Sequence, residues 1–462
     1  MKTLKTNVCI IGAGAGGFGC LYRLLKNGIN AVIVDENPGF GGTSVFGGVN
    51  CWEPGVSLDG VHQEIAAALL QCDHAAMVAK TVPNCRLLDG TDEHSFEKYP
   101  WGLSVKAEDP YVSTLKRCKL FHGGKPEEFR RFQFEDTAMS LVMDHLTDHD
   151  GCQKLFGYKL LFANADNGIV RYVIVGNGSE FIKIHADYFV DATGSIVLAR
   201  MVDCEAAVGS EPYSQYNEPS APDKKDMCLN GVTYVFRVAK KAAVKDGYDF
   251  DTECRESDII SCFNMYPNGD INVNMLPTMS GEAYLKDPFP DKTGFETVKN
   301  YWNCLQRKKG MSQYTITKIF KAGIREDYRI VGKYVLTEND MIQGVFNQNQ
   351  VSGIIAVADH AMDIHGKGGR CKELDVPYGI PVDCSMTKEY ENLFVACRGA
   401  SFSHIAASSA RLTRTMISFG EGVGEYLSEM LLNGFYRNIV QGARFSEFVK
   451  DLRMLHPETA GT

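Results

Sequence analysis

The sequence predicts an α/β fold in which a largely parallel sheet is built from both ends of the chain and an α+β unit is inserted between them. Near the N-terminus, an apolar run at 8–11, an amphipathic helix and a second apolar run at 31–34 fit within roughly 30 residues, the size of a βαβ unit. Near the C-terminus, a short apolar strand at 393–396 precedes a long helix from about 412 to 432. The apolar residues of that helix recur at helical spacing.

The segments between these ends alternate in type. The first helix is expected to stop at Asn27-Gly28, because glycine takes the left-handed conformation after a helix without steric cost. Helices are expected at 64–70, 135–146 and 293–322, and loops at 83–110. Strands are expected at 158–162, 170–175, 181–185, 188–191, 232–238 and 271–276. A Ser-, Pro- and Asp-rich stretch at 210–226 predicts a loop at a domain boundary.

Composition excludes several classes of protein. The 462 residues are enough for two or three domains, and the formal net charge of −9 argues against nucleic acid and anionic membranes as partners. No apolar run is long enough to span a bilayer, and the N-terminus lacks the apolar core of a secretory signal, so a cytoplasmic location is expected. The 15 cysteines include no CxxC pair, so no metal site is expected.

A glycine motif, Gly12-x-Gly14-x-x-Gly17, follows the first strand and opens the first helix. This is the context in which it binds a dinucleotide. Gly12 permits a tight turn, Gly14 lets the backbone approach a pyrophosphate, and Gly17 lets the helix pack against the strand. The free N–H groups of the helix N-terminus then face two phosphates. Asp35, at the end of the second strand, is expected to accept hydrogen bonds from ribose hydroxyls and to disfavour a 2′-phosphate.

A second glycine turn, Gly41-Gly42-Thr43-Ser44, follows Asp35. With this turn the chain resembles FAD-binding proteins of the glutathione-reductase structural family. A strand ending in Ala192-Thr193-Gly194 and the segment 391–424 resemble that family's later cofactor segments. The segments 47–56, 325–340 and 362–366 resemble a bacterial subfamily of FAD-dependent oxidoreductases with no assigned substrate. Motif and resemblance together predict these cofactor-binding residues: Gly12, Gly14, Ala15, Gly16, Gly17, Asp35, Glu36, Gly41, Gly42, Thr43, Ser44, Gly48, Val49, Asn50, Ala192, Thr193, Gly194, Arg411 and Thr415.

The resemblance implies a domain plan: a Rossmann-type FAD-binding domain with an inserted α+β substrate domain. The FAD-binding domain is expected at 1–56, 130–208 and 385–435, the substrate or cap domain at 57–129 and 209–384, and a C-terminal helical tail at 436–462. A separate nicotinamide domain is not expected, because no second complete G-x-G-x-x-G unit appears. Covalent attachment of FAD through a histidine is unsupported, because residues 39–50 contain none.

Three glycines, Gly420, Gly422 and Gly424, fall inside the last predicted helix. Each costs roughly 1 kcal/mol relative to alanine in a helix interior, so their presence needs a reason. Close approach of the helix to the cofactor or to the first βαβ unit is one explanation, and simple helix–helix contact is the other. The sequence leaves both open.

Redox chemistry at a flavin requires a nearby proton donor or acceptor. His404, between the last strand and the last helix, is the first catalytic candidate, against the alternative of a packed histidine. His365 is the second, against a turn residue bonded to backbone. Arg325 could clamp a substrate carboxylate, whereas Arg329 is better explained by a structural ion pair. Arg411 precedes the last helix, where a cation is unfavourable unless something anionic lies nearby.

The sequence therefore predicts an FAD-dependent oxidoreductase that transfers a hydride between a small organic substrate and non-covalently bound FAD. Two alternatives remain. The protein could be an FAD-bearing subunit that passes electrons to a redox partner, or the FAD could assist a non-redox hydration or isomerisation. The substrate, the second electron carrier and the oligomeric state are not predicted.

Overall fold

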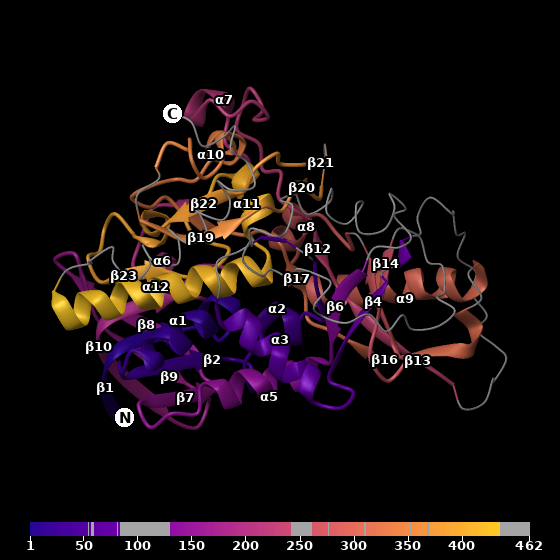
Figure 1. Ribbon diagram of the computed structural model, residues 1–462, viewed down its shortest axis with the longest axis horizontal. Coiled ribbons are helices and arrows are strands. Elements are labelled where there is room, and N and C mark those ends of the chain that lie inside the picture. The colour runs from indigo at the N-terminus through magenta and orange to yellow at the C-terminus, as the bar shows by residue number, and fades with distance from the viewer. Residues whose placement is uncertain are drawn as a thin grey trace, which may run out of the picture.

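A computed structural model describes residues 1–53, 55–56, 60–80, 82–83, 130–241, 261–275, 277–308, 311–350, 353–366 and 369–434. The predicted C-terminal helical tail at 436–462 and almost all of the predicted loop region at 83–110 lie outside these residues. Figure 1 shows two parts, a parallel sheet with helices on one side of the molecule and a smaller sheet with its own helix on the other.

The main sheet draws strands from both the N-terminal and the C-terminal parts of the described chain. Its order is β7-β2-β1-β10-β9-β8, with β23 paired to the C-terminal half of β10. The strands β7, β2, β1, β10 and β23 run parallel, and β9 and β8 add an antiparallel edge. The bounds are β1 Lys2–Ile11, β2 Ala31–Asp35, β7 Cys152–Phe156, β8 Lys159–Asp166, β9 Ile169–Gly176, β10 Phe181–Asp191 and β23 Leu393–Val395.

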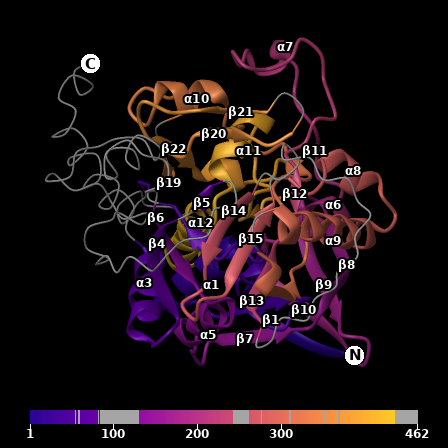
Figure 2. The ribbon, with the colours of Figure 1, turned by 90° about the vertical axis from the view of Figure 1, so that its right-hand side faces the viewer.

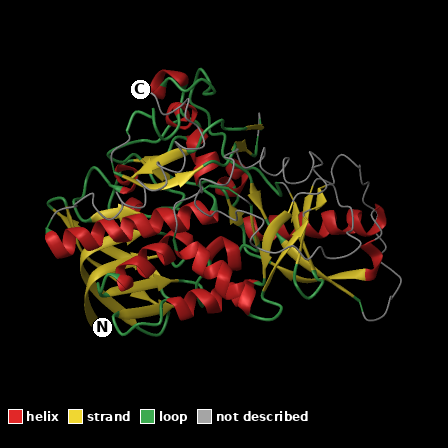
Figure 3. Ribbon diagram, viewed as in Figure 1, coloured by secondary structure: helices red, strands yellow, loops and turns green. Residues whose placement is uncertain are grey.

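Helices cover this sheet and bury its apolar side chains in one continuous core. Helix α1 packs along helix α12, and α12 in turn packs on the two-stranded β19–β22 sheet, as Figure 3 shows. Helices α3 and α5 lie against each other beside them. The bounds are α1 Ala15–Lys26, α3 Val61–Gln71, α5 Asp136–Leu146, α12 Thr413–Asn433, β19 Ile354–Ala358 and β22 Tyr378–Pro381.

The inserted unit has a separate core. Its five-stranded antiparallel sheet, in the order β16-β13-β15-β14-β5, packs on helix α9 through Phe236, Tyr301 and Trp302. Figure 2 faces this unit. The bounds are β5 Val82–Pro83, β13 Phe236–Lys240, β14 Ser261–Met265, β15 Ile271–Met275, β16 Tyr314–Ile319 and α9 Pro290–Lys308.

The remaining elements are short. The short strands are β3 Cys51–Trp52, β4 Ala76–Lys80, β6 Arg130–Phe134, β11 Ala206–Ala207, β12 Val232–Thr233, β17 Gly323–Ile324, β18 Arg329–Ile330, β20 Met362–Ile364 and β21 Arg370–Lys372. The short helices are α2 Gly42–Val45, α6 Val197–Met201, α7 Tyr213–Tyr216, α8 Gly281–Lys286, α10 Glu338–Gln343 and α11 His404–Ala410, with 3₁₀ turns at Met311–Gln313 and Val382–Ser385.

The predicted α/β fold is confirmed, including the βαβ unit and the long final helix. The helix expected at 293–322 is wrong beyond Lys308. Residues of β16 such as Thr315, Ile316 and Ile319 are β-branched and pair with β13, which outweighs helical spacing. Within the described residues, no helix has the length and apolar character needed to cross a membrane. The same residues contain no cluster of three or more potential metal ligands.

Candidate active site

The first glycine loop joins β1 to α1, and its glycines do different work. Gly12 has a φ of +109°, and a Cβ there would collide with the carbonyl group of Ala192. A Cβ at Gly16 would collide with the carbonyl group of Ala396. A Cβ at Gly14, by contrast, would have no neighbour closer than 3.9 Å, the distance to the Cα of Gly42. The missing side chain of Gly14 therefore leaves open space, not protein contact.

Asp35 ties this loop to the next strand. Its Oδ2 accepts a hydrogen bond of 2.6 Å from the N–H of Ala13, and its Oδ1 accepts one of 2.7 Å from the N–H of Asn37. Burial raises the pKa of Asp35, and the hydrogen bonds from Ala13 and Asn37 oppose that shift. The carboxylate thus orders the glycine loop in addition to any contact with a ligand.

The second glycine turn lies directly against the first. The N–H of Gly41 donates to the carbonyl oxygen of Ala13 at 3.0 Å, and a Cβ at Gly42 would lie 2.8 Å from the Cα of Gly14. Gly41 and Gly42 both have positive φ, at +117° and +47°. The hydroxyl group of Ser44 reaches Thr413, at the start of α12, at 3.3 Å. Two glycine turns and a helix N-terminus therefore meet at one point.

A buried carboxylate builds the third turn, after β10. The Oδ1 of Asp191 accepts hydrogen bonds from the N–H and the hydroxyl group of Thr193, and its Oδ2 accepts one from the N–H of Ala199. Burial raises the pKa of Asp191. Gly194 has a φ of +81°, and a Cβ there would collide with the guanidinium group of Arg398.

The glycines of α12 serve helix packing. A Cβ at Gly420 would strike the carbonyl group of Gly16, and one at Gly424 would meet the backbone of Cys20, also on α1. A Cβ at Gly422 would meet Ile355 of β19. Of the two explanations left open by the sequence, the structure supports close approach of α12 to the βαβ unit, and this approach is itself a helix–helix contact.

The three turns surround a pocket of about 420 Å³, within the range of small-molecule sites. Thirteen of the predicted cofactor residues line it: Gly14, Ala15, Gly16, Asp35, Gly41, Gly42, Thr43, Ser44, Val49, Ala192, Thr193, Gly194 and Arg411. Six do not: Gly12, Gly17, Glu36, Gly48, Asn50 and Thr415. Gly12 and Gly17 instead shape the loop, and Glu36 is exposed and pairs with Lys159.

His404 is not among the residues that line the pocket. It begins α11 and is buried, and its Nδ1 lies 2.8 Å from Oε2 of Glu326. Glu326 also pairs with Arg329, whose Nη2 contacts Glu211 at 2.6 Å. His404 and Arg329 thus belong to a buried network that fixes the loop before α11. The ion-pair explanation fits Arg329, and the geometry gives no support to His404 as a catalytic group.

His365 lines the pocket together with Asp363. Its Nε2 lies 2.6 Å from Oδ2 of Asp363, and its backbone N–H donates to Asn230. Burial lowers the pKa of His365, and the charges of Arg325 and Arg411 act in the same direction against the pull of Asp363. The imidazole is therefore neutral at pH 7, with its Nδ1 making no hydrogen bond to another described residue.

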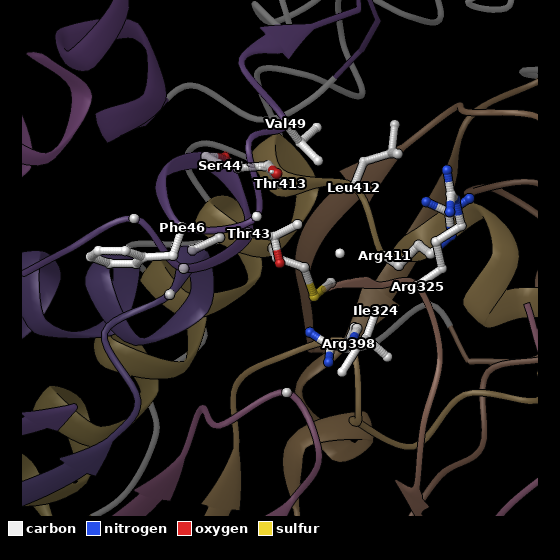
Figure 4. A pocket seen from close by; sticks show the side chains of 18 of the residues that line it. Thr43, Ser44, Phe46, Val49, Ile324, Arg325, Arg398, Arg411, Leu412 and Thr413 are labelled. Carbon is white, nitrogen blue, oxygen red and sulfur yellow. Dashed lines mark hydrogen bonds between the residues drawn. The ribbon is translucent and has the colours of Figure 1, made fainter. Parts of the chain in front are cut away.

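Arginines approach the pocket from several elements. Figure 4 shows Arg325 and Arg411 at one end, far from Phe46, with Arg398 between them and the glycine turns. The Nη1 of Arg325 donates to the carbonyl oxygen of Gly231 and to Thr233. Arg398 was missed in the sequence, although its position two residues after the predicted strand at 393–396 could have indicated it.

The pocket also contains a second histidine that the sequence did not single out. His360 is buried, and its Nε2 lies 3.2 Å from Oε2 of Glu53. Although burial opposes it, this carboxylate raises the pKa of His360. Arg131 forms an ion pair with the same carboxylate. Both ring nitrogens of His360 therefore contact protein oxygen atoms, whereas the Nδ1 of His365 makes no hydrogen bond to another described residue.

These residues fit a bound dinucleotide. Gly14 leaves room where a backbone must approach a ligand, and the first N–H that donates within α1 is that of Phe18, so the preceding N–H groups are unused. Cationic side chains line the pocket beyond the turns. The site thus offers both the cradle and the charge that a pyrophosphate requires.

A family model described as FAD dependent oxidoreductase matches residues 7–431. None of the curated proteins matches this chain significantly. Among solved structures, a geranylgeranyl bacteriochlorophyll reductase-like protein from Thermoplasma acidophilum is 11% identical, with a TM-score of 0.46 over 98% of this chain and 88% of that one. The p-nitrophenol 4-monooxygenase of Pseudomonas putida DLL-E4 is also 11% identical, with a TM-score of 0.44 over 100% and 88%. With TM-scores this low, the family assignment rests on the family model.

Proposed function

The chain belongs to the FAD dependent oxidoreductase family, and we propose that it transfers a hydride between a small organic substrate and non-covalently bound FAD. The observation that carries the proposal is that the open space at Gly14 and a neutral histidine, His365, belong to the same pocket. A site for a cofactor and a site for proton transfer therefore share one cavity.

The residues that would hold FAD are those of the three turns. Gly14 and the first N–H groups of α1, together with Gly42, Thr43 and Ser44, would face its phosphates. Asp35, which lines the pocket, would accept a hydrogen bond from a ribose hydroxyl group. Bound FAD supplies the acceptor or donor for a hydride. The strand order β7-β2-β1-β10-β23 supports placing this domain in the glutathione-reductase structural family.

His365 replaces His404 as the proposed acid or base. Its Nε2 is bound to Asp363, which fixes the orientation of the ring and leaves Nδ1 to accept a proton. A substrate that loses a hydride from carbon also loses a proton from its hydroxyl or amino group, and a neutral imidazole can take that proton. In the reverse direction the imidazolium returns it.

We retain the domain plan as part of the proposal. The main sheet, drawn from 1–56, 130–208 and the segment after 385, would bind FAD. The unit around α9 and the five-stranded sheet, from the segments 57–129 and 209–384, would cover the substrate. Support comes from the pocket itself, because Thr233, Val235 and Asn274 of the inserted unit line it together with the glycine turns.

A pair of glycine variants tests FAD binding. We expect Gly14→Val to fold, because its Cβ has space and its φ of −73° suits valine, but to lose FAD, because the side chain fills the cradle. Gly16→Val is the matched control and should lose the fold, because its Cβ collides with Ala396. The measurements are FAD content after gel filtration and the circular dichroism spectrum. A folded Gly14→Val protein with a full complement of FAD contradicts the proposal.

A further inference from the structure

Two arginines in the pocket have no partner among the described residues. Arg398 and Arg411 are half-buried, and the Nε of each is shielded from solvent without a hydrogen-bond acceptor. No hydrogen bond or ion pair joins either guanidinium group to the rest of the described chain. Burial lowers the pKa of both. Charged groups out of water require compensation, so these two point to an anion that the protein itself does not supply.

The other arginines that line the pocket are bound by protein groups. Arg131 pairs with Glu53, Arg414 donates to the carbonyl oxygen of Val56, and Arg325 donates to Gly231 and Thr233. All five arginines line the same pocket, but only Arg398 and Arg411 lack a hydrogen-bond acceptor or ion-pair partner among the described residues.

The two unpartnered arginines lie in different parts of the pocket. Arg398 lies against Gly194, at the third glycine turn, which belongs to the cofactor side. The negative charge of Asp363 acts to raise the pKa of Arg411, and the positive charge of Arg411 acts to lower the pKa of His365. Figure 4 shows Arg411 beside Arg325, away from Phe46 and the second glycine turn. Arg411 is thus part of the proton-transfer end.

We propose that the substrate is an organic carboxylate, and that Arg411, with Arg325 beside it, binds the carboxylate group next to His365. This inference rests on the proposed function and names its substrate class. A guanidinium group donates two parallel hydrogen bonds to a carboxylate, which would fix the substrate carbon near the imidazole. Arg411, which the sequence suggested for the cofactor, takes the substrate in this assignment.

The charge balance favours a single carboxylate over a phosphate at this end. Arg325 and Arg411 carry two positive charges, and Asp363, whose pKa is lowered against burial mainly by its hydrogen bond to His365, carries one negative charge. His365 is neutral. The net charge of +1 complements a monoanionic carboxylate, whereas a phosphate of charge near −2 would leave an excess of negative charge beside Asp363.

The test is an equilibrium titration of the FAD-loaded protein without turnover. The probes are propionate, succinate and benzoate, each compared with its amide, and the readouts are the visible absorbance of bound FAD and the heat of binding. We expect at least one carboxylate to bind 10-fold or more tightly than its amide. In Arg411→Met this preference should disappear, a loss of roughly 10- to 100-fold, with FAD content unchanged. Arg411→Lys should keep part of it.

Arg171→Gln, at the exposed position of β9 and outside the pocket, is the matched control and should bind as the wild type does. The inference is overturned if no carboxylate is preferred to its amide, or if the preference survives in Arg411→Met. It is equally overturned if Arg411→Met loses FAD, because Arg411 then serves the cofactor phosphates. Binding of carboxylates without any reduction of FAD by substrates would leave this inference standing and refute hydride transfer instead.

Discussion

The protein buries arginine in two contrasting ways. Arg329 is 1% exposed, and every part of its guanidinium group is used: Nε donates to Phe402, Nη2 to Gly209 and Glu211, and Nη1 to Glu326. Arg411, on the other side of α11, is less buried yet contacts no acceptor in the described chain. The first arrangement is complete without a ligand, and the second is not.

This difference separates a structural charge from a functional one. Removing one partner of a satisfied buried pair leaves the other partners uncompensated, whereas removing an unpaired charge relieves a cost that the folded protein already bears. Substitutions at the two sites should therefore change stability in opposite directions. The contrast is best measured on protein saturated with FAD, because differences in cofactor binding would otherwise change the measured stability.

The largest effect is expected at Arg329. Replacing it by methionine leaves Glu326 and Glu211 buried without their cation, so we expect the free energy of unfolding to fall by about 3–5 kcal/mol. Denaturant unfolding followed by circular dichroism measures it, with Arg171→Gln as the exposed control. A loss below about 1 kcal/mol would mean that water or neighbouring groups replace the arginine, and the contrast would not hold.

A smaller effect of opposite sign is expected at Arg411. With FAD bound but no carboxylate present, the free energy of unfolding of Arg411→Met should be about 1 kcal/mol higher than that of the wild type. The reason is that the substitution removes an uncompensated polar group from a half-buried position. Thermal and denaturant unfolding would both show this gain, and Arg411→Lys should show less of it. A loss of stability comparable to that of Arg329→Met would assign Arg411 a structural partner and end the comparison.

The smallest effect concerns the two histidines of the pocket. Burial lowers the pKa of His365, so its contribution to stability is present above pH 6.5 and is lost as the pH falls below that value. Glu53 raises the pKa of His360 against burial, so its contribution is present below pH 6.5 and is lost as the pH rises.

Unfolding free energies between pH 5 and 8 measure these slopes. His365→Gln should reduce the loss of stability on acidification, and His360→Gln should reduce the loss on the alkaline side. If both substitutions changed the same limb of the profile, the two rings would share one environment. The separation into a protein-bound histidine and a free catalytic one would then be wrong.

The glycine turns that line the pocket could be predicted from the sequence because their signals are local. Gly12, Gly14 and Asp35 fall within one βαβ unit, and the chemistry of that unit depends on backbone shape more than on distant partners. The thirteen predicted residues that line the pocket come mostly from three such turns.

The end of the pocket where we propose proton transfer could not be predicted in the same way. His404 was favoured by its place in the chain, but Glu326, 78 positions earlier, binds its ring in a buried network. No residue near His404 in the sequence indicates that Glu326 is its partner. The position of Arg411 before the last helix drew attention to it in the sequence, but only the fold shows that neither Arg411 nor Arg398 has an acceptor among the described residues.

The packing of α12 on α1 has a consequence for biosynthesis. Arg23 and Glu421, which form an ion pair across these helices, lie 398 positions apart in the chain, and Gly420 touches the backbone of the first glycine loop. While the ribosome is still synthesising the middle of the chain, helix α12, which supports that loop, does not yet exist. Contacts this distant in sequence also slow folding. The nascent chain should thus acquire its cofactor only near the end of translation, and a stop codon placed before α12 should yield colourless protein.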